Sequence, residues 1–346
     1  MRIAVVFDTP YARWEPEDHL RQMEKELAAR GEGAEEPEME YQVAGALRDN
    51  GHEIILLGVK DELQPMLQQL AAWQPDLVVN AAEGFRDNAR LDYLFATLFE
   101  AEGYRFTGSP PLAMLVTRNK AMSKKILAYH GIQVPGFETY GVGEAVRGEP
   151  SLRFPLIVKP LQTDASAGIA LASVVANRDA LAERVAFVHE RFQQPAIAEE
   201  FVEGRELYVS VVGNQDLEIL PVVEMVFDKE KNPPEERIAT LSAKWHEGYR
   251  ERKGIRNVFA RPIAKAVRAK LEEVCCTAYR ALWLHDYARF DLRLAPTGEI
   301  WVLEANANPF ISYGHDVANA AEKAGMPYPA FIERIVTEAR ARYGRQ

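Results

Sequence analysis

Apolar and polar residues alternate through residues 288–310, and this pattern predicts two β-strands joined by a tight turn at Pro296 and Gly298. If Leu294 pairs with Glu299, one face of the hairpin collects the apolar residues Phe290, Leu292, Leu294, Trp301 and Leu303. The opposite face collects the polar residues Arg289, Asp291, Glu304 and Asn306. Mg²⁺ takes carboxylate oxygens in proteins, with water and substrate phosphates completing its shell. The pattern therefore favours a metal site on Asp291, Glu304 and Asn306, and a solvated polar face is the alternative.

Short apolar runs near the N terminus predict buried parallel strands at residues 2–7, 53–57 and 76–80. Helical stretches follow the second and third of these runs at residues 62–73 and 91–102. This alternating order predicts a doubly wound parallel sheet, with ligands at the carboxyl ends of its strands. No G-x-G-x-x-G follows the first strand and the chain has no G-x-x-x-x-G-K-[ST], which disfavours a dinucleotide-binding fold and a P-loop.

Lysines mark the next part of the chain. Residues 117–130 predict a helix with Lys120 and Lys124 one turn apart, for which a solvated basic face is the alternative. An apolar strand is predicted to end on Lys159, which there needs an anionic partner such as a phosphate. The small polar residues 161–168 predict a loop whose backbone N–H groups and Ser166 hydroxyl can cover phosphate oxygens. A plain hairpin turn explains the same composition.

Acidic residues follow at the end of another apolar strand. Glu199 and Glu200, with Glu206 after a turn, can hydrogen-bond an adenine amino group and a ribose, and salt bridges within the sheet are the alternative. This strand is predicted to belong to a second, mixed sheet. Residues 228–258 show no clear periodicity, and loops of this length tend to be functional lids or disordered segments. Lys244 is the candidate functional residue within that stretch.

Length and composition describe an ordinary globular protein. A chain of 346 residues predicts two or three domains, which we set at residues 1–113, 114–195 and 196–346. The formal net charge of −10 argues against a nucleic-acid-binding surface. No apolar run approaches the roughly 18 residues of a membrane span. The adjacent cysteines at 275 and 276 argue against a structural disulfide, so we expect a cytoplasmic protein. A homodimer is one option for its assembly.

Taken together, several of these segments resemble the ATP-grasp superfamily and, within it, the D-alanine–D-alanine ligases. The resemblance covers residues 80–343 and rests on GSP with the later K-x-x-x-K, FPLIVKP, EEFVEGRE and ARFD…VLEANANP. It implies an α/β (α+β) ATP-grasp fold. Such a fold has an N-terminal doubly wound parallel sheet, a small central domain with a nucleotide flap, and a C-terminal metal-binding domain with a mixed sheet.

The resemblance also implies roles for individual residues. ATP would be bound by Lys120, Lys159, Ser166, Gly168, Glu199, Glu200, Phe201, Val202 and Glu206. Mg²⁺, with Mn²⁺ as an alternative, would be held by Asp291, Glu304 and Asn306. The implied catalytic residues are Arg289, where charge develops during acyl transfer, Lys244, which closes on the γ-phosphate, and Ser166 in the flap.

The chain departs from the family where the amino-acid substrates bind. The family's glycine-rich, Ser- and Glu-containing segment after the first strand is missing. The replacements in other family motifs are Asp164 and Ala165 in the flap, Trp245 for a tyrosine, and Phe310 for a glycine. His315 is the residue nearest to the position of a substrate-binding serine. The residues that bind ATP and metal in the family therefore match this sequence better than the residues that bind its amino-acid substrates.

The predicted activity is an ATP-dependent carboxylate–amine ligase that acts through an acyl phosphate, with amino acids or short peptides as substrates. One alternative is the D-alanine–D-alanine ligase of cell-wall synthesis itself. A nucleotide-binding protein without ligase activity is the alternative from another class. A dehydrogenase built on the N-terminal unit is disfavoured because the glycine fingerprint is missing.

Overall fold

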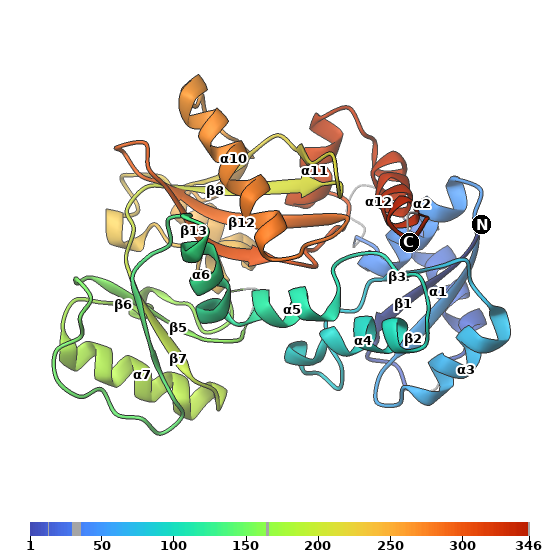
Figure 1. Ribbon diagram of the computed structural model, residues 1–346, viewed down its shortest axis with the longest axis horizontal. Coiled ribbons are helices and arrows are strands. Elements are labelled where there is room, and N and C mark those ends of the chain that lie inside the picture. The colour runs from blue at the N-terminus through green and yellow to red at the C-terminus, as the bar shows by residue number, and fades with distance from the viewer. Residues whose placement is uncertain (13, 30–35, 164–165, 345–346) are drawn as a thin grey trace.

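The fold is built around three β-sheets, seen in a computed structural model that describes residues 1–12, 14–29, 36–163 and 166–344. The predicted flap residues Asp164 and Ala165 lie outside this part of the chain. Figure 1 shows the N-terminal sheet at one end, and the central and C-terminal sheets together at the other. The predicted α/β class is confirmed.

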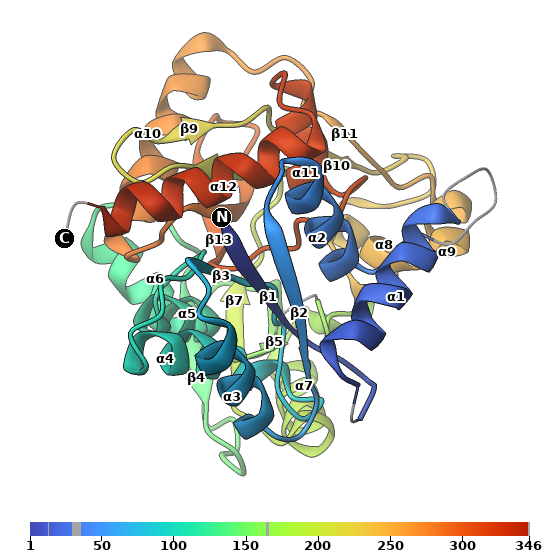
Figure 2. The same ribbon diagram turned by 90° about the vertical axis from the view of Figure 1, so that its right-hand side faces the viewer.

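The N-terminal sheet is parallel, as predicted, with strand order β2-β1-β3. Its strands are β1 (Arg2–Asp8), β2 (Glu53–Val59) and β3 (Leu77–Asn80). Successive β1 residues enter different cores, because strand side chains alternate between faces. Ala4 and Val6 share a core with α3 (Gln64–Trp73) and α4 (Tyr93–Ala101). Val5 belongs to another core, which it shares with α1 (Pro16–Ala28), α2 (Met39–Asp49) and α12 (Tyr328–Tyr343). Figure 2 shows these three helices next to the N-terminal sheet.

The central sheet has strand order β4-β7-β5-β6, with antiparallel pairing throughout. Its strands are β4 (Phe137–Tyr140), β5 (Leu156–Pro160), β6 (Val174–Val175) and β7 (Ala196–Glu200). Helix α7 (Arg178–Phe192) packs on it through Leu181, Val185 and Val188. The expectation that the strand beginning at residue 196 belongs to the C-terminal sheet is wrong, because β7 pairs with β4 and β5.

The C-terminal sheet has the order β11-β10-β8-β12-β13, with β9 added on β8. Every pairing in its described residues is antiparallel, so the expected mixed sheet is a purely antiparallel one. Its strands are β8 (Arg205–Val212), β9 (Glu218–Ile219), β10 (Val223–Val226), β11 (Arg256–Phe259), β12 (Tyr287–Leu294) and β13 (Ile300–Asn306). Helix α10 (Lys265–Ala281) shares a core with Phe290 and Leu292 of β12.

Two consecutive helices link the N-terminal unit to the other sheets (Figure 1), and they are α5 (Pro111–Arg118) and α6 (Lys120–Tyr129). The Asn119 side chain accepts a hydrogen bond from the Met122 backbone N–H and so caps α6. A cap of this kind fixes where a helix begins. Lys120 therefore lies in the first turn, and Lys124 lies one turn later.

The aperiodic stretch 228–258 is folded rather than a long open loop. It contains α8 (Leu241–Trp245), α9 (Glu247–Lys253) and strand β11. Thr240 caps α8 through the Ala243 N–H, and the Arg250 guanidinium donates to the Ala243 carbonyl. These contacts hold α8, which carries Lys244, against its neighbour. None of the described helices combines the length and the apolar character that a bilayer span requires.

Candidate active site

A β-bulge shapes the hairpin of β12 and β13. Leu294 pairs with Ile300 instead of Glu299, and the register shifts between Asp291 and Leu292 so that Leu303 has no Cα partner across the ladder. The residues of β13 that enter the core are Ile300, Val302 and Ala305. The predicted register, with Trp301 and Leu303 on the apolar face, is therefore wrong. The predicted polar face survives because the bulge brings Glu304 opposite Asp291 and Asn306 opposite Arg289.

Asp291 is buried among donors on the polar face. Arg289 Nε donates to its Oδ1 over 2.8 Å, and Lys244 Nζ lies 3.2 Å from its Oδ2. Asn306 Nδ2 lies 3.2 Å from Oδ1. Burial raises the pKa of Asp291, but the cations of Arg289 and Lys244 outweigh it and hold the pKa below its usual value. The carboxylate is therefore ionised at neutral pH.

Glu304 is held by a different cation. Lys120 Nζ lies 2.8 Å from Glu304 Oε1 and also donates to the Thr163 carbonyl over 2.6 Å. Burial raises the pKa of Glu304, and Lys120 overcomes this effect and lowers the pKa below its usual value. Lys120 thus connects β13 with the loop that follows β5.

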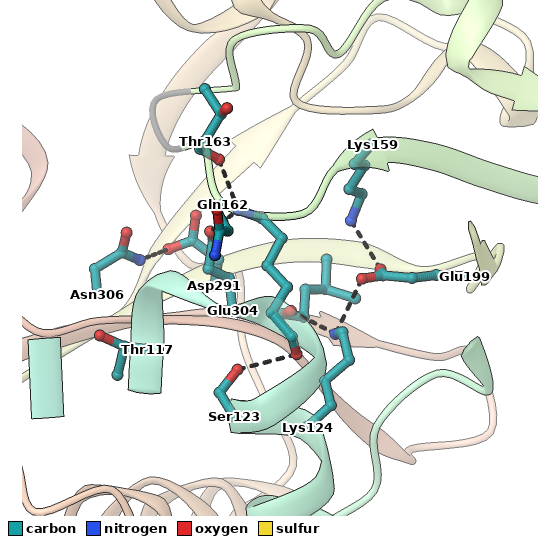
Figure 3. A network of polar contacts seen from close by, with 12 residues as sticks. Thr117, Ser123, Lys124, Lys159, Gln162, Thr163, Glu199, Asp291, Glu304 and Asn306 are labelled. Carbon is teal, nitrogen blue, oxygen red and sulfur yellow. Dashed lines mark hydrogen bonds and ion pairs between the residues drawn. The ribbon is translucent and has the colours of Figure 1, made fainter. Parts of the chain in front are cut away.

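Glu199 lies between two lysines, as Figure 3 shows. Lys159 Nζ donates to its Oε2 over 2.8 Å, and Lys124 Nζ lies 3.4 Å from its Oε1. Lys124 also donates to the Leu303 carbonyl over 2.6 Å and is only 1% exposed. The solvated-face alternative is therefore wrong for Lys124, and sequence reasoning missed it as a site residue. Burial raises the pKa of Glu199, but the two lysines outweigh it and keep the pKa low.

A narrow cavity of about 60 Å³ lies among these groups. The predicted site residues that line it are Lys159, Ser166, Glu199, Glu200, Phe201, Val202, Glu206, Lys244, Asp291 and Glu304. Lys120 contacts the lining residue Glu304. Arg289 and Asn306 contact the lining residue Asp291.

Three predicted nucleotide ligands have protein partners that the sequence did not show. Glu199 directs both carboxylate oxygens to lysines, and Glu200 binds the Arg153 guanidinium at 3.2 Å. Glu206 pairs with Arg293 at 2.6 Å, and Arg293 also lines the cavity. The salt-bridge alternative thus describes these three carboxylates as they stand here, and their contacts with adenine and ribose stay predictions.

Gly168 lies in the segment between β5 and β6, against Pro160 of β5 and Phe192 of α7. Its φ is +79°, and a Cβ there would lie 2.6 Å from Pro160 and 2.8 Å from Phe192. Arg184 donates to its carbonyl over 2.7 Å. A side chain at this position would displace the flap, so glycine is required by close packing and backbone conformation.

The predicted metal ligands form a small set. Within the residues that the structure describes, no group of three or more His, Cys, Asp and Glu side chains converges on one point. The predicted set is made of the Asp291 and Glu304 carboxylates and the Asn306 amide, whose Nδ2 donates to Asp291 Oδ1. The set is oxygen-only, which suits Mg²⁺ or Mn²⁺.

The family described as the D-ala D-ala ligase C-terminus matches residues 127–337. The chain belongs to the D-Ala–D-Ala ligase family. This ligase therefore uses ATP to form an amide bond between small-molecule substrates, and its ATP-grasp fold is the one predicted.

Individual relatives agree with this assignment. The chain is 32% identical to the uncharacterized protein y4sG of Sinorhizobium fredii, with 87% of each chain covered. It is 29% identical to a D-alanine–D-alanine ligase of Aquifex aeolicus, with 85% of this chain and 92% of that one covered. The fold matches that of a D-alanine–D-alanine ligase from Bacillus anthracis complexed with ATP, with a TM-score of 0.73, 19% identity and full coverage of both chains.

A second cavity of this ligase, about 700 Å³ in volume, adjoins the first. Lys244 lines both cavities, and Arg289 lines the second. Aromatic rings form one wall: the Phe310 ring lies 4.7 Å from the His315 ring and 6.5 Å from the Trp245 ring. All three are among the residues that depart from the family pattern, so these departures meet in one place.

Sequence reasoning missed most of the polar lining of this second cavity. Those residues are Arg250, Arg256, Asn257, Asp316 and Asn319, together with the acidic Glu247 and Glu251. The first three lie in the aperiodic stretch, where no pattern distinguishes a site residue from a surface one. Asn257 accepts from Arg250 and donates to Asp316 over 2.8 Å, so a network orders this side of the cavity.

Proposed function

We propose that this ligase activates the carboxylate of one amino acid or short peptide as an acyl phosphate and joins it to the amine of another. The main support for this proposal is that Lys244 borders both cavities. A group in this position can contact a phosphate on one side and a substrate on the other. The large cavity is then the substrate cavity, and the narrow one is the nucleotide cavity.

The nucleotide cavity has the charge that a triphosphate requires. Lys120, Lys159 and Lys244 each pair with a carboxylate in the structure, and phosphate oxygens are alternative acceptors for the same ammonium groups. Ser166 and Gly168 supply the flap over the phosphates. Glu199, Glu200, Phe201 and Val202 are the proposed adenine contacts and Glu206 the ribose contact.

Asp291, Glu304 and Asn306 are the proposed ligands of Mg²⁺, or of Mn²⁺. Asp291 is buried and Glu304 is partly buried, and both carboxylates are ionised and adjacent across the hairpin, which suits a hard divalent cation. The metal ion would neutralise charge on the transferring phosphoryl group. Lys120 and Lys244 hold the same carboxylates here, so both ammonium groups are positioned to turn toward the nucleotide when a cation takes their place.

The chemistry then follows from positions and charges. A carboxylate oxygen of the first substrate attacks the γ-phosphorus as its bond to the bridging oxygen of ADP breaks. The amine nitrogen of the second substrate attacks the acyl carbon, phosphate leaves with the C–O electron pair, and the amine proton passes to water. The Arg289 guanidinium, held by Asp291 at the border of the substrate cavity, stabilises the oxyanion that forms during the second step. Water must be excluded, because it would hydrolyse the acyl phosphate.

Phosphate release tests this proposal when the purified protein is given ATP and Mg²⁺ with amino acids and dipeptides in pairs. We expect phosphate release to depend on both substrates and to match amide formation measured by mass spectrometry. ATP hydrolysis that is indifferent to added amines would overturn the proposal. D-alanine–D-alanine synthesis is the second candidate, and the Aquifex aeolicus relative favours it by name. The cytoplasmic location, the homodimer and the domain boundaries stay predictions.

A further inference from the structure

A third cavity extends the substrate cavity away from the reaction centre. It measures about 560 Å³ and reaches Phe259 and Lys323. The two cavities share four lining residues, which are Asn257, Val258, Asp316 and Asn319. They therefore adjoin, and together they form a groove between β11 and α11 (Asp316–Lys323), which we call the β11 groove.

The wall of this groove is the edge of a sheet. β11 is the end strand of the C-terminal sheet as far as the structure describes it. Consecutive residues 257, 258 and 259 all line the third cavity, although neighbouring side chains of a strand point to opposite faces. A cavity that touches all three runs along the strand edge rather than across one face of the sheet.

Some backbone groups of β11 point away from the sheet, toward the groove. Ala260 donates its N–H to the Val222 carbonyl, and β11 pairs antiparallel with β10. Alternate residues of an antiparallel strand bond to the same neighbour, so Val258 faces β10. Asn257 and Phe259 therefore turn their N–H and C=O groups away from β10. An extended peptide can pair with groups presented in this way.

The groove is too large for one small amino acid. Cavities of roughly 300–1,000 Å³ take drug-sized ligands, and the substrate cavity alone lies in that range. Strand β11 spans four residues, or about 13 Å, which equals about four residues of an extended peptide. A peptide with its reacting end at Lys244 and Arg289 would use this length.

We propose that one substrate of this ligase is a peptide of at least two residues, bound in extended form along β11. This inference rests on the proposed function and adds the substrate class. The reacting end lies between Arg289 and the aromatic wall of Trp245 and Phe310. The rest of the peptide pairs with Asn257 and Phe259 and continues toward Lys323.

A substrate series tests the length. Turnover is measured with single amino acids, dipeptides, tripeptides and tetrapeptides of one composition, each with the same partner substrate. We expect kcat/KM to rise by a factor of about ten or more from amino acid to tripeptide and then to level off. Equal values for amino acids and peptides would overturn the inference and leave the ligase activity intact.

Backbone methylation tests the pairing with β11. Tripeptides carrying one N-methyl group at successive amides are compared, since only alternate amides of an extended peptide face the strand. We expect a loss at one amide and little change at its neighbour. Uniform tolerance of methylation would contradict binding along β11.

The third test uses a variant that fills the end of the β11 groove far from the reaction centre. Glu322 is exposed and lines only the third cavity, so Glu322→Trp should reduce kcat/KM for tripeptides and spare amino acids. Ala324→Trp, at the exposed end of the same helix but outside the lining, is the control. Calorimetry with a non-hydrolysable ATP analogue measures peptide binding independently of turnover. Binding of tripeptides without any turnover would refute the proposed function alone, and failure of tripeptides to bind more tightly than amino acids would refute this inference.

Discussion

Asp291 and Glu304 lie directly opposite each other on β12 and β13 because a β-bulge at Leu303 shifts the ladder by one residue. Each carboxylate is held by its own cations, Asp291 by Arg289 and Lys244, and Glu304 by Lys120. Two adjacent carboxylates, one buried and one partly buried, would repel each other strongly without these partners. The bulge therefore creates the acidic pair, and three cations from different elements offset the repulsion between the two carboxylates.

Replacing Glu304 by Gln should remove turnover almost completely and keep the fold. The amide has the same size but carries no charge toward a divalent cation, and it weakens the hold on Lys120. We expect kcat to fall by a factor of about 100 or more, as for a lost electrostatic group at a reaction centre. Glu299→Gln at the exposed hairpin turn is the matched control. Loss of activity together with a collapsed melting temperature would indicate a structural role instead.

The sequence predicts the polar face of this hairpin but not how it forms. Alternation alone identifies Asp291 and Glu304, because acidic residues stand out in apolar strands. It cannot reveal the bulge, because the pattern of apolar and polar residues does not show that Leu303 has no partner on the opposite strand. The register predicted without it assigns Trp301 to the core, where Ile300 and Val302 lie instead.

Lys124 illustrates a second limit of the sequence. Helical spacing shows that it lies one turn from Lys120, and most such lysines are solvated. Its burial depends on β7 and β13, which come from distant parts of the chain and supply Glu199 and the Leu303 carbonyl. Local pattern carries no information on such partners. The parallel N-terminal sheet was predictable because its strands are short apolar runs in a regular order.

Replacing Lys124 by Met should destabilise the protein. Glu199 is fully buried and would keep only one of its two lysine partners. Breaking a buried ion pair on one side costs about 3–5 kcal/mol, and Lys159 should reduce that to the lower end. Urea unfolding measures the difference. The neighbouring exposed residue gives the control Lys125→Met, which should change stability by less than about 0.5 kcal/mol. Equal effects of the two variants would refute the role of Lys124.

Lys159 should matter mainly to the nucleotide. Lys159→Met removes an ammonium group from the nucleotide cavity and should weaken ATP binding by a factor of roughly 10–100, the range for a charge-assisted hydrogen bond. From the sequence alone, with no protein partner in view, the replacement would be neutral or stabilising. The pair with Glu199 reverses that expectation, so the protein without nucleotide should also lose stability. Calorimetric titration and thermal unfolding of the same variant separate the two effects.

Glu40 should make the protein less stable as the pH rises. Burial raises the pKa of Glu40 from 4.5 to about 9, so the folded state keeps a proton that the unfolded state releases between these values. Stability then falls with increasing pH across that window. Burial lowers the pKa of His19 and His285 to about 4, and these groups act in the opposite sense only below about pH 6.5. Burial also raises the pKa of the Cys275 and Cys276 thiols, which act in the same sense as Glu40 near the top of the range between about pH 7 and pH 9. The contribution of Glu40 is therefore the part of the pH dependence that a Glu40 variant removes.

The measurement is the urea midpoint at both ends of that range, for the parent and for Glu40→Gln. We expect the parent to be less stable at the higher pH, and the variant to reduce this difference by more than about 1 kcal/mol, the equivalent of roughly one pKa unit. Glu24→Gln, on the exposed side of α1, should leave the difference unchanged. An unaltered pH dependence in Glu40→Gln would show that Glu40 is ionised in the folded protein.

D-alanine should be a poor substrate for this ligase. The Phe310 ring fills the position where the family has a glycine, and it contacts Trp245 and His315 across the substrate cavity. A methyl side chain would leave most of this apolar wall uncovered, whereas a larger apolar or aromatic side chain would bury it, at about 25 cal/mol for each Å² removed from water. We expect D-alanine alone to support turnover about ten times lower than the best amino acid or peptide pair, measured by phosphate release. Phe310→Gly should narrow that gap by reopening the close approach of the backbone, while Phe259→Ala, far from the reaction centre, should not improve D-alanine. Efficient turnover of D-alanine by the unaltered protein would show that the aromatic wall does not select the substrate.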